Sequence, residues 1–384
     1  MITDEVLRPT QLKVDLQKLL SNYRLLEAHA GVPVMAILKA NAYGHGLDEV
    51  AQLLERAGCS YFGLAYVEEG IRLREIGVRT PILILGGIIG EQIDLFLKHD
   101  LTITASSVDK LKSIDAAAKK RGCMARVHLK IDTGMERIGT HYYNAASLLS
   151  AAHQADSVLV EGIYSHLANA DELDLSHARL QVQRFTDVLQ WYTENEIPRP
   201  LTHLANSGAL LQLPETHFDM VRAGILLYGV YPSSTIPRTL PVKPALSWHT
   251  RVVFFKVVLP GHPVSYGSTW QSEEWTRVVT LPVGYGDGYH RRMSGQAEVI
   301  IRGQRYPVVG RICMDQAMVN IGRDEAFNGD AVVLLGSDGE STITVEDLAE
   351  WADTIPYEIL TSVNTRVSRV FIWPAMEESN ALEK

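Results

Sequence analysis

The segment VPVMAILKANAYGHG, residues 32–46, joins an apolar run to a lysine, a tyrosine and two glycines. The run Val32–Ala40 is short and apolar, and an amphipathic segment follows it, which is the pattern of a strand that leads into a helix. Lys39 stands at the end of this strand, and the glycines let the backbone turn tightly behind it. We therefore predict a βα unit with an inward, desolvated lysine at its rim.

The same alternation continues along the first two thirds of the chain. Amphipathic segments such as residues 68–77 and 176–196 separate the runs and are suited to cover a parallel sheet. A further helix over residues 16–30, capped by Asp15, precedes the first run. The later runs are Ser60–Ala65, Pro81–Gly87, Leu101–Ala105, Arg126–Asp132, Val158–His166, Leu201–Asn206 and Asp219–Gly224. With the first run this makes eight βα units, which predicts an α/β barrel of the (β/α)8 TIM type over residues 1–240.

The rhythm changes at PRTLPVKP, residues 237–244, where prolines accumulate and helical patterns stop. Beyond it, segments such as TRVVFFKVVL, RVVTLPVGYG, AEVIIRG, QRYPVVGRI and DAVVLLG have the alternation of strands. We predict a linker and then a mostly β C-terminal domain over residues 241–384.

Composition narrows the classes of function. The 384 residues carry 36 basic and 45 acidic side chains, a net charge of −9, without a basic cluster for nucleic acid or an anionic membrane. No apolar stretch is long enough to cross a bilayer, and the acidic N-terminus MITDEVL does not resemble a signal peptide. The 3 cysteines are widely separated, which favours a reducing cytoplasm and neither disulfides nor a metal site. We expect a small-molecule partner.

Polar residues gather where the predicted strands end, and barrel enzymes build their active sites from these ends. Each alone has an ordinary interpretation: Lys39 reaching water, His166 as a satisfied strand-end histidine, or Arg222 paired with Asp219. Together they provide an amine for a Schiff base, cationic and imidazole groups for a ring, and hydroxyls and amides for a phosphate. They are Lys39, Tyr43, Lys130, Arg137, His166, Asn206, Ser207, Arg222, Gly224 and Ile225. This combination suits pyridoxal 5′-phosphate.

Motifs across nearly the whole chain resemble those of alanine racemase, in the same order. They are AILKANAYGHG, HLANS, VRAGILLYG, VSYGSTW, GYGDGY, GRICMDQ and PYEILTSVNTRVSR. The resemblance implies an isomerase that interconverts L- and D-alanine by a two-base mechanism through an external aldimine of pyridoxal phosphate. Its D-alanine would serve as a peptidoglycan precursor.

The resemblance also assigns the two catalytic bases. Lys39 would bind the cofactor and act on one face of the substrate, and Tyr266 of a neighbouring subunit would act on the other, so the enzyme would be a homodimer with shared active sites. A free tyrosine, with a pKa of about 10, is a poor base, so a chain from Tyr266 through His166 to Arg222 would activate it. Arg222 would face the pyridine nitrogen and keep it unprotonated.

Further roles follow from the same resemblance. Tyr43, Ser207, Gly224, Ile225 and Tyr357 would hold the phosphate, with Asn206 nearby. Arg137 would contact cofactor and substrate carboxylate, and the Met314 segment of the partner would hold that carboxylate too. Lys130 would carry a carbamate or form a buried ion pair. Asp171, Tyr285 and Arg311 would line a narrow entrance. Glu136 departs from the glycine of many relatives, placing a carboxylate beside Arg137.

Three other functions share some of these features. A broad-specificity racemase acting on serine, lysine or arginine would use the same residues. A barrel-type decarboxylase shares the strand-one lysine and has a catalytic cysteine in its second domain, where this chain has Cys313, but Arg222 argues against it. A non-catalytic pyridoxal-phosphate carrier would explain Lys39 but needs neither the β domain nor Tyr266.

Overall fold

The computed structural model describes residues 8–374, so residues 1–7, on which the exclusion of a signal peptide partly rests, lie outside it. The chain forms two compact units. A barrel unit comprises Leu20–Lys243, and a β unit comprises the described parts of Met1–Leu19 and Pro244–Lys384. No helix within residues 8–374 has the length and apolarity needed to span a membrane.

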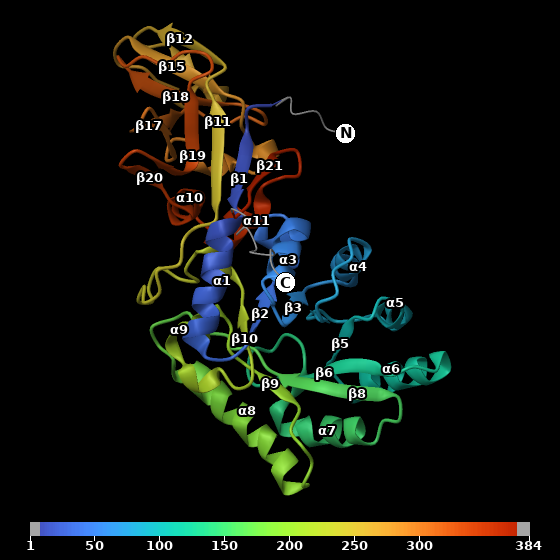
Figure 1. The fold of residues 1–384 in the computed structure, drawn as a ribbon. Coiled ribbons are helices and arrows are strands. Elements are labelled where there is room, and N and C mark those ends of the chain that lie inside the picture. Colours follow the sequence, from blue (N-terminus) through green and yellow to red (C-terminus); the bar gives the residue numbers. More distant parts are fainter. Residues whose placement is uncertain (1–7, 375–384) are drawn as a thin grey trace, which may run out of the picture. The chain divides into compact units, whose positions relative to one another are not determined.

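The barrel unit contains parallel strands in the order β10-β2-β3-β4-β5-β6-β8-β9, most of which are labelled in Figure 1. The N–H groups of Asp219 and Arg222 donate to the carbonyls of Thr202 and Ala205, which joins β9 to β10. The strands are β2 (Val34–Ile37), β3 (Tyr61–Leu64), β4 (Ile82–Ile84), β5 (Thr102–Ala105), β6 (Ala125–Asp132), β8 (Val158–Tyr164), β9 (Leu201–His203) and β10 (Val221–Ala223), with the short β7 (Thr140–His141) beside β6. All eight predicted runs are therefore strands, and the predicted (β/α)8 barrel is confirmed.

Helices alternate with these strands and lie on the outside of the sheet in Figure 1. Asp15 accepts from the Lys18 N–H at 3.0 Å, so the predicted cap of the first helix is present. The helices are α1 (Leu16–Ala30), most of which belongs to this unit, α2 (Lys39–Tyr43), α3 (Leu47–Arg56), α4 (Val67–Glu75), α5 (Ile93–Lys98), α6 (Val108–Arg121), α7 (Ala145–His153), α8 (Ser176–Glu194) and α9 (Ser207–Gln212).

The barrel interior is apolar around Gly63 of β3 and polar over β6 to β10. A Cβ added at Gly63 would lie 2.5 Å from Ile37, which shows how tightly the apolar side is packed. The opposite side buries His128, Lys130, His203 and Arg222. Buried charged and polar groups are costly unless they are hydrogen-bonded, so this concentration marks a functional region.

The β unit contains one large sheet in the order β12-β15-β18-β17-β16-β19-β11-β1-β21, with β20 beside β19 and a separate β13-β14 hairpin. Its strands are β1 (Gln11–Asp15), β11 (Leu246–Arg251), β12 (Phe254–Val258), β13 (Pro263–Val264), β14 (Trp270–Gln271), β15 (Thr276–Leu281), β16 (Glu298–Ile301), β17 (Gln304–Val309), β18 (Ala317–Gly322), β19 (Ala331–Asp338), β20 (Ser341–Ile343) and β21 (Ser368–Ile372). The helices α10 (Val345–Ala352) and α11 (Pro356–Ser362) complete it.

Two details differ from the sequence expectations. The N-terminal segment is not part of the barrel, because β1 pairs with β11 and β21 of the β unit. Only long-range strand pairing decides this, and no local pattern carries it. The segment TRVVFFKVVL is also not one strand: β11 pairs with β1 and β19, whereas β12 pairs with β15. The cut between the units, after Lys243, falls inside the proline-rich segment.

Candidate active site

Lys39 follows β2 directly and opens an unusual turn. Residues Ala40, Asn41, Ala42 and Tyr43 have φ values of 54°, 56°, 53° and 52°, so four consecutive non-glycine residues are left-handed. This conformation costs about 1–2 kcal/mol per L-residue. The chain then leaves the turn through Gly44 and Gly46, also at positive φ. A strained run beside a rim lysine is typical of a functional site.

The Lys39 amine is electrostatically prepared for nucleophilic chemistry. Burial is the main cause that lowers its pKa, and the positive charges of Arg137 and Arg222 lower it further, while Glu69 opposes them. A lowered pKa raises the neutral fraction at pH 7, and only the neutral amine can attack a carbonyl. Lys39 is therefore suited to carry a cofactor as a Schiff base.

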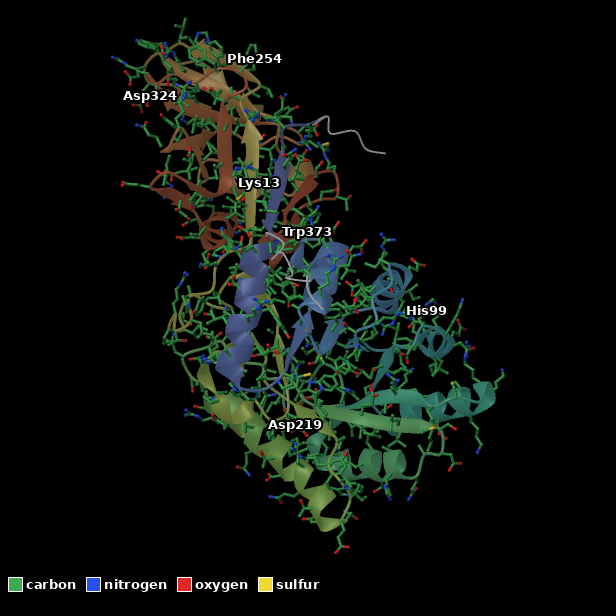
Figure 2. All side chains as sticks on the ribbon, viewed as in Figure 1. Lys13, His99, Asp219, Phe254, Asp324 and Trp373 are labelled. Atoms are coloured by element: carbon green, nitrogen blue, oxygen red, sulfur yellow. The ribbon has the colours of Figure 1, made fainter. Side chains whose placement is uncertain are left out.

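Arg222 on β10 is buried, and its contacts explain its orientation. Its Nη1 donates to His203 Nδ1 at 3.0 Å, and its Nη2 donates to the Ser165 carbonyl at 2.8 Å and to His166 Nδ1 at 3.2 Å. Burial lowers the pKa of Arg222 to about 10, which leaves it cationic near neutrality. Asp219, labelled in Figure 2, pairs instead with Arg199, so the ordinary interpretation of Arg222 is wrong.

The contacts of Arg222 fix the proton on His166. A guanidinium can only donate, so His166 Nδ1 must accept and the neutral ring carries its proton on Nε2. Burial, followed by the charge of Arg222, holds the pKa of His166 well below its usual value, which keeps the ring neutral. The inner half of the expected relay is therefore present in the barrel unit.

The same reasoning extends a polarised chain through the barrel. His203 Nε2 must donate to His128 Nδ1 at 2.9 Å, because Arg222 occupies its Nδ1. His128 Nε2 faces the Tyr61 hydroxyl at 3.4 Å, which donates to Glu161 at 3.2 Å. Burial lowers the pKa of His128 to about 3, so it stays neutral. The chain runs from a cation to a carboxylate and holds Arg222 in one orientation.

Arg137 lies in the loop after β6, and Asp132 at the end of that strand shapes the loop. One carboxylate oxygen of Asp132 accepts from the backbone N–H groups of Gly134, Met135 and Glu136. The other accepts from the backbone N–H of Arg137. The Arg137 side chain is exposed and has no hydrogen bond or ion pair within the described residues. It is an uncommitted cation suited to a carboxylate ligand. The Glu136 carboxylate lies 3.7 Å from His141.

We expect Asp132→Asn to lower the free energy of unfolding by about 1–3 kcal/mol at pH 7, because an amide has one acceptor oxygen for four N–H groups. Burial raises the pKa of Asp132, but the N–H donors outweigh it and lower the value. A carboxyl group whose pKa is lower in the folded protein than in the unfolded chain stabilises the fold at pH values above its unfolded pKa. This stabilisation is lost as the pH falls through the folded pKa. Chemical denaturation measured from pH 7 downward should therefore show that the difference in free energy of unfolding between the unchanged protein and Asp132→Asn decreases in acid. Asp156→Asn, which breaks an exposed ion pair, should change little.

Lys130 on β6 is buried beside the Tyr164 ring, with its Nζ 4.4 Å from the ring centroid. Within residues 8–374 it makes no ion pair, so the predicted structural ion pair is absent from the barrel. Burial, followed by the charge of Arg222, holds its pKa well below the usual value. A neutral amine in this position can accept carbon dioxide.

Hydroxyls and helix starts converge after β9 and β10. The Ser207 hydroxyl at the start of α9 accepts from the Gly224 N–H at 3.0 Å, which leaves its proton for another acceptor. Ile225 opens the short helix η4 (Ile225–Tyr228), and N–H groups in a first helical turn lack partners within the helix. A Cβ at Gly224 would lie 2.8 Å from the Tyr43 hydroxyl. Asn206 instead caps α9 by accepting from the Ala209 N–H.

Most of the other predicted residues lie in the β unit, and four of their loops form a second group. Ser265, before Tyr266, donates to the Arg311 carbonyl at 2.6 Å, and the Tyr285 N–H donates to the Cys313 carbonyl. The Gly286 N–H donates to the Met314 carbonyl, so the loops of Tyr266, Tyr285, Arg311 and Met314 are held together. Tyr266 is 70% exposed and Met314 is 52% exposed. Tyr357 lies separately on α11, and Asp171 belongs to the barrel unit.

Sequence reasoning missed the residues that hold the predicted ones. Asp132, His128, His203 and Asp287 contact ligand candidates or their loops, but the sequence analysis assigned them no role, although His203 and Asp287 lie inside the motifs HLANS and GYGDGY. Buried Asp287 pairs with Arg8 and Arg366, and Arg366 also pairs with Asp315, next to Met314. One signal was available: a polar residue such as His203 inside a short apolar strand needs a buried partner.

These residues fit pyridoxal phosphate. Arg222 Nε has no hydrogen bond within the described residues, although both Nη atoms do, and a pyridine nitrogen would be its acceptor. The Ser207 hydroxyl, the Ile225 N–H at the start of η4 and the space above Gly224 suit a phosphate. The amine of Lys39, with its lowered pKa, is suited to react with the aldehyde.

Comparison with known proteins identifies the family. Residues 14–232 match the model of the alanine racemase N-terminal domain, and residues 245–371 match that of the C-terminal domain. The chain belongs to the alanine racemase family. The alanine racemase of Carboxydothermus hydrogenoformans is 42% identical over 369 residues, 95% of this chain and 100% of that protein. The structure of alanine racemase from Streptomyces lavendulae is 36% identical, with a TM-score of 0.91 over 97% of this chain and 99% of that one.

Membership of the alanine racemase family assigns the enzyme class and the cofactor. Alanine racemases are isomerases that depend on pyridoxal phosphate, which agrees with the amine, ring and phosphate contacts of the barrel. A histidine racemase from Leuconostoc mesenteroides is more distant, at 27% identity with a TM-score of 0.88 over 96% of this chain and 99% of that one. The fold therefore serves more than one substrate.

Proposed function

We propose that this chain interconverts L- and D-alanine with Lys39 and Tyr266 as the two bases. The observation that carries the proposal is the geometry around Lys39: an amine with a lowered pKa, an uncommitted Arg137, and an Arg222 fixed by two neutral histidines. Bound pyridoxal phosphate supplies the electron sink that makes the α-proton of the amino acid removable. The protein binds and orients the cofactor and the substrate, and its side chains move the proton.

The cofactor would be held by groups at both ends. Lys39 would bind its aldehyde carbon, Arg222 Nε would donate to its pyridine nitrogen, and Ser207, Tyr43 and the amides of Gly224 and Ile225 would hold its phosphate. Tyr357 would add a hydroxyl from the β unit. A guanidinium facing the ring nitrogen does not protonate it, which limits the electron sink and disfavours decarboxylation.

The proton moves between Cα and one base on each face. The Lys39 Nζ would take or return the proton on its face, and the Tyr266 hydroxyl of a partner subunit would do so on the other. His166 supports this role, because its Nε2 carries the proton and can donate to the tyrosine oxygen. Arg137 and the Met314 N–H of the partner would hold the substrate carboxylate.

A homodimer with shared active sites follows from this assignment, and the surface of the β unit supports it. The outer edge of the sheet, β12, exposes Phe254, Phe255 and Val257 by 52%, 41% and 54% (Phe254 is labelled in Figure 2). Clustered exposed apolar side chains on an edge strand mark an interface. A pocket of about 660 Å³ beside β12 includes Tyr266 in its wall.

We propose further that Lys130 carries a carbamate. Its lowered pKa supplies the neutral amine, and the charges of Arg222 and Arg137 that act on it would stabilise the carbamate anion. In bicarbonate, the intact mass of the protein should increase by one carbon dioxide, and the mass of Lys130→Ala should not. Equal masses of the unchanged protein with and without bicarbonate would oppose the proposal.

We expect Gly224→Ala to weaken binding of pyridoxal phosphate about tenfold or more, which corresponds to about 1.4 kcal/mol. The new methyl group would lie 2.8 Å from the Tyr43 hydroxyl and occupy the space assigned to the phosphate. Fluorescence titration of the cofactor-free protein measures the effect. Gly87→Ala is the matched control, because a Cβ there meets nothing within 4 Å. Equal affinities of both variants would contradict the phosphate assignment.

The test of the function is incubation of the cofactor-loaded protein with L-alanine in deuterium oxide. Chiral chromatography and mass spectrometry should find D-alanine carrying one solvent deuteron. Serine, lysine, arginine and histidine are tested in parallel, because the histidine racemase relative makes a second substrate class concrete. Faster turnover of one of these would replace the alanine assignment, and no turnover of any would favour a non-catalytic carrier.

The remaining proposals concern the cell. We propose a cytoplasmic enzyme that supplies D-alanine for peptidoglycan, and its three cysteines are free thiols, as expected in a reducing compartment. The entrance would be lined by Asp171, Tyr285 and Arg311. This would limit the size of the substrate side chain.

A further inference from the structure

A carboxylate outside the predicted site bridges two loops at the end of the barrel that carries Lys39. Glu69 lies in the first turn of α4, after β3, and β3 is the parallel neighbour of β2. Its Oε1 accepts from the Ala40 N–H at 2.7 Å. Its Oε2 accepts from the N–H groups of Ala65 at 2.8 Å and Tyr66 at 3.2 Å. One oxygen therefore caps α4, and the other reaches the residue after Lys39.

The Ala40 contact falls where the backbone needs support. Ala40 begins the four-residue left-handed run, and such a run persists only where surrounding contacts hold it. Inside the turn, the Ala42 N–H donates to Leu38 and the Gly44 N–H donates to Ala40. The Asn41 side chain accepts from the Leu47 N–H at 2.8 Å. Glu69 is the partner that ties the start of the turn to another strand's loop.

We propose that Glu69 is a positioning residue for Lys39, because its carboxylate pins the left-handed turn 40–43 through the Ala40 N–H. The inference rests on the proposed role of Lys39 as the amine that binds pyridoxal phosphate. It assigns Glu69 two effects, a geometric one on the turn and an electrostatic one on the amine.

The electrostatic effect has a defined direction. The groups that act on Lys39 besides burial are Arg137 and Arg222, which lower its pKa, and Glu69, which raises it. Glu69 is thus the anion that limits how far Arg137 and Arg222 lower the pKa of the Lys39 amine. Removing its charge should lower the pKa of Lys39 further, which loss of a purely structural contact would not do.

The first test uses Glu69→Gln with Glu68→Gln as its matched control. Both residues lie in the first turn of α4, so each variant loses the same charge at the same helix end, but Glu68 is exposed. A glutamine has one acceptor oxygen and cannot serve both loops. Competitive acetylation of the cofactor-free full chain across pH, with peptide mass spectrometry, gives the pKa of Lys39. Capture of pyridoxal phosphate is followed by absorbance.

We expect Glu69→Gln to lower the pKa of Lys39, which alone would favour attack by the amine. Because the Lys39 turn loses its support, cofactor capture should nevertheless slow about tenfold or more, whereas Glu68→Gln changes neither property. Adding Ala40→Gly to Glu69→Gln should restore the capture rate, because glycine adopts positive φ without strain, but not the pKa. Equal behaviour of the Glu69 and Glu68 variants would overturn the proposal. None of these readouts needs racemisation, so they remain informative if the substrate assignment fails.

A measurement on the unchanged protein covers the case in which Glu69→Gln does not fold. The Ala40 residue is exposed, yet its N–H is bonded to Glu69, so its hydrogen exchange should be slower than in an unstructured peptide. Exchange mass spectrometry at residue resolution reports this. Exchange at the unprotected rate would show that the contact is not maintained and would overturn the proposal.

Discussion

Lys39→Ala is expected to lower racemisation of alanine by at least about 10³-fold, because it would remove both the proposed covalent anchor of the cofactor and the proposed base on one face. The lowered pKa of Lys39 makes its amine the group suited to both tasks. Turnover in deuterium oxide and the absorbance of the protein-bound cofactor measure the two losses separately. Binding through the phosphate contacts should persist in weaker form.

Lys112→Ala serves as the control for Lys39→Ala, since Lys112 is an exposed lysine on α6 of the same unit. It should retain full activity and cofactor absorbance. If Lys39→Ala retained the absorbance of a Schiff base, another lysine would have to carry the cofactor, and Lys130 would be the next candidate. That result would contradict the proposed site.

Tyr266→Phe is expected to reduce racemisation by about 10²–10⁴-fold, the contribution of one general acid–base group, while leaving exchange on one face. Lys39 would still remove and return the α-proton of one enantiomer. That enantiomer should therefore gain solvent deuterium without inversion, and the other should neither exchange nor invert. Incubating L-alanine and D-alanine separately in deuterium oxide distinguishes them by mass.

Tyr306→Phe is the matched control for Tyr266→Phe, because Tyr306 is a tyrosine of β17 in the same unit, bonded to Gln304 and Asp324. It should racemise normally. Equal loss of exchange for both enantiomers in Tyr266→Phe would mean that the tyrosine supports the whole site and is not the base of one face.

The predicted strands show which part of the fold could be predicted from local pattern. Each of the eight βα repeats is a short apolar run followed by an amphipathic one, and the barrel follows from repetition and strand handedness. The membership of β1 could not be predicted in this way, because its partners, β11 and β21, lie more than 200 residues away in sequence. Nothing in QLKVD distinguishes a strand of the barrel from one of the β unit.

The candidate site also divides into residues that local sequence predicts and residues that depend on tertiary contacts. Lys39, His166, Ser207 and Arg222 could be predicted because they stand where predicted strands end, and motif resemblance added Tyr266. Most of the supporting groups could not be predicted, although His203, a polar residue inside a short apolar strand, carried a signal. Asp132 acts through four backbone N–H groups, and Glu69 reaches a loop 29 residues away. Such contacts depend on where loops meet.

By itself, the sequence determined the barrel, the position of the lysine proposed to bind the cofactor, and the residue types proposed to face a phosphate and a ring, because each depends on local periodicity or on the end of a strand. The tertiary structure decided the protonation states of the site side chains and the directions of their hydrogen bonds. Arg222 fixes the proton positions of His166 and His203 because a guanidinium only donates, and burial sets the pKa of Lys39 and Lys130. These properties arise from neighbours distant in the chain, so no segment carries them alone.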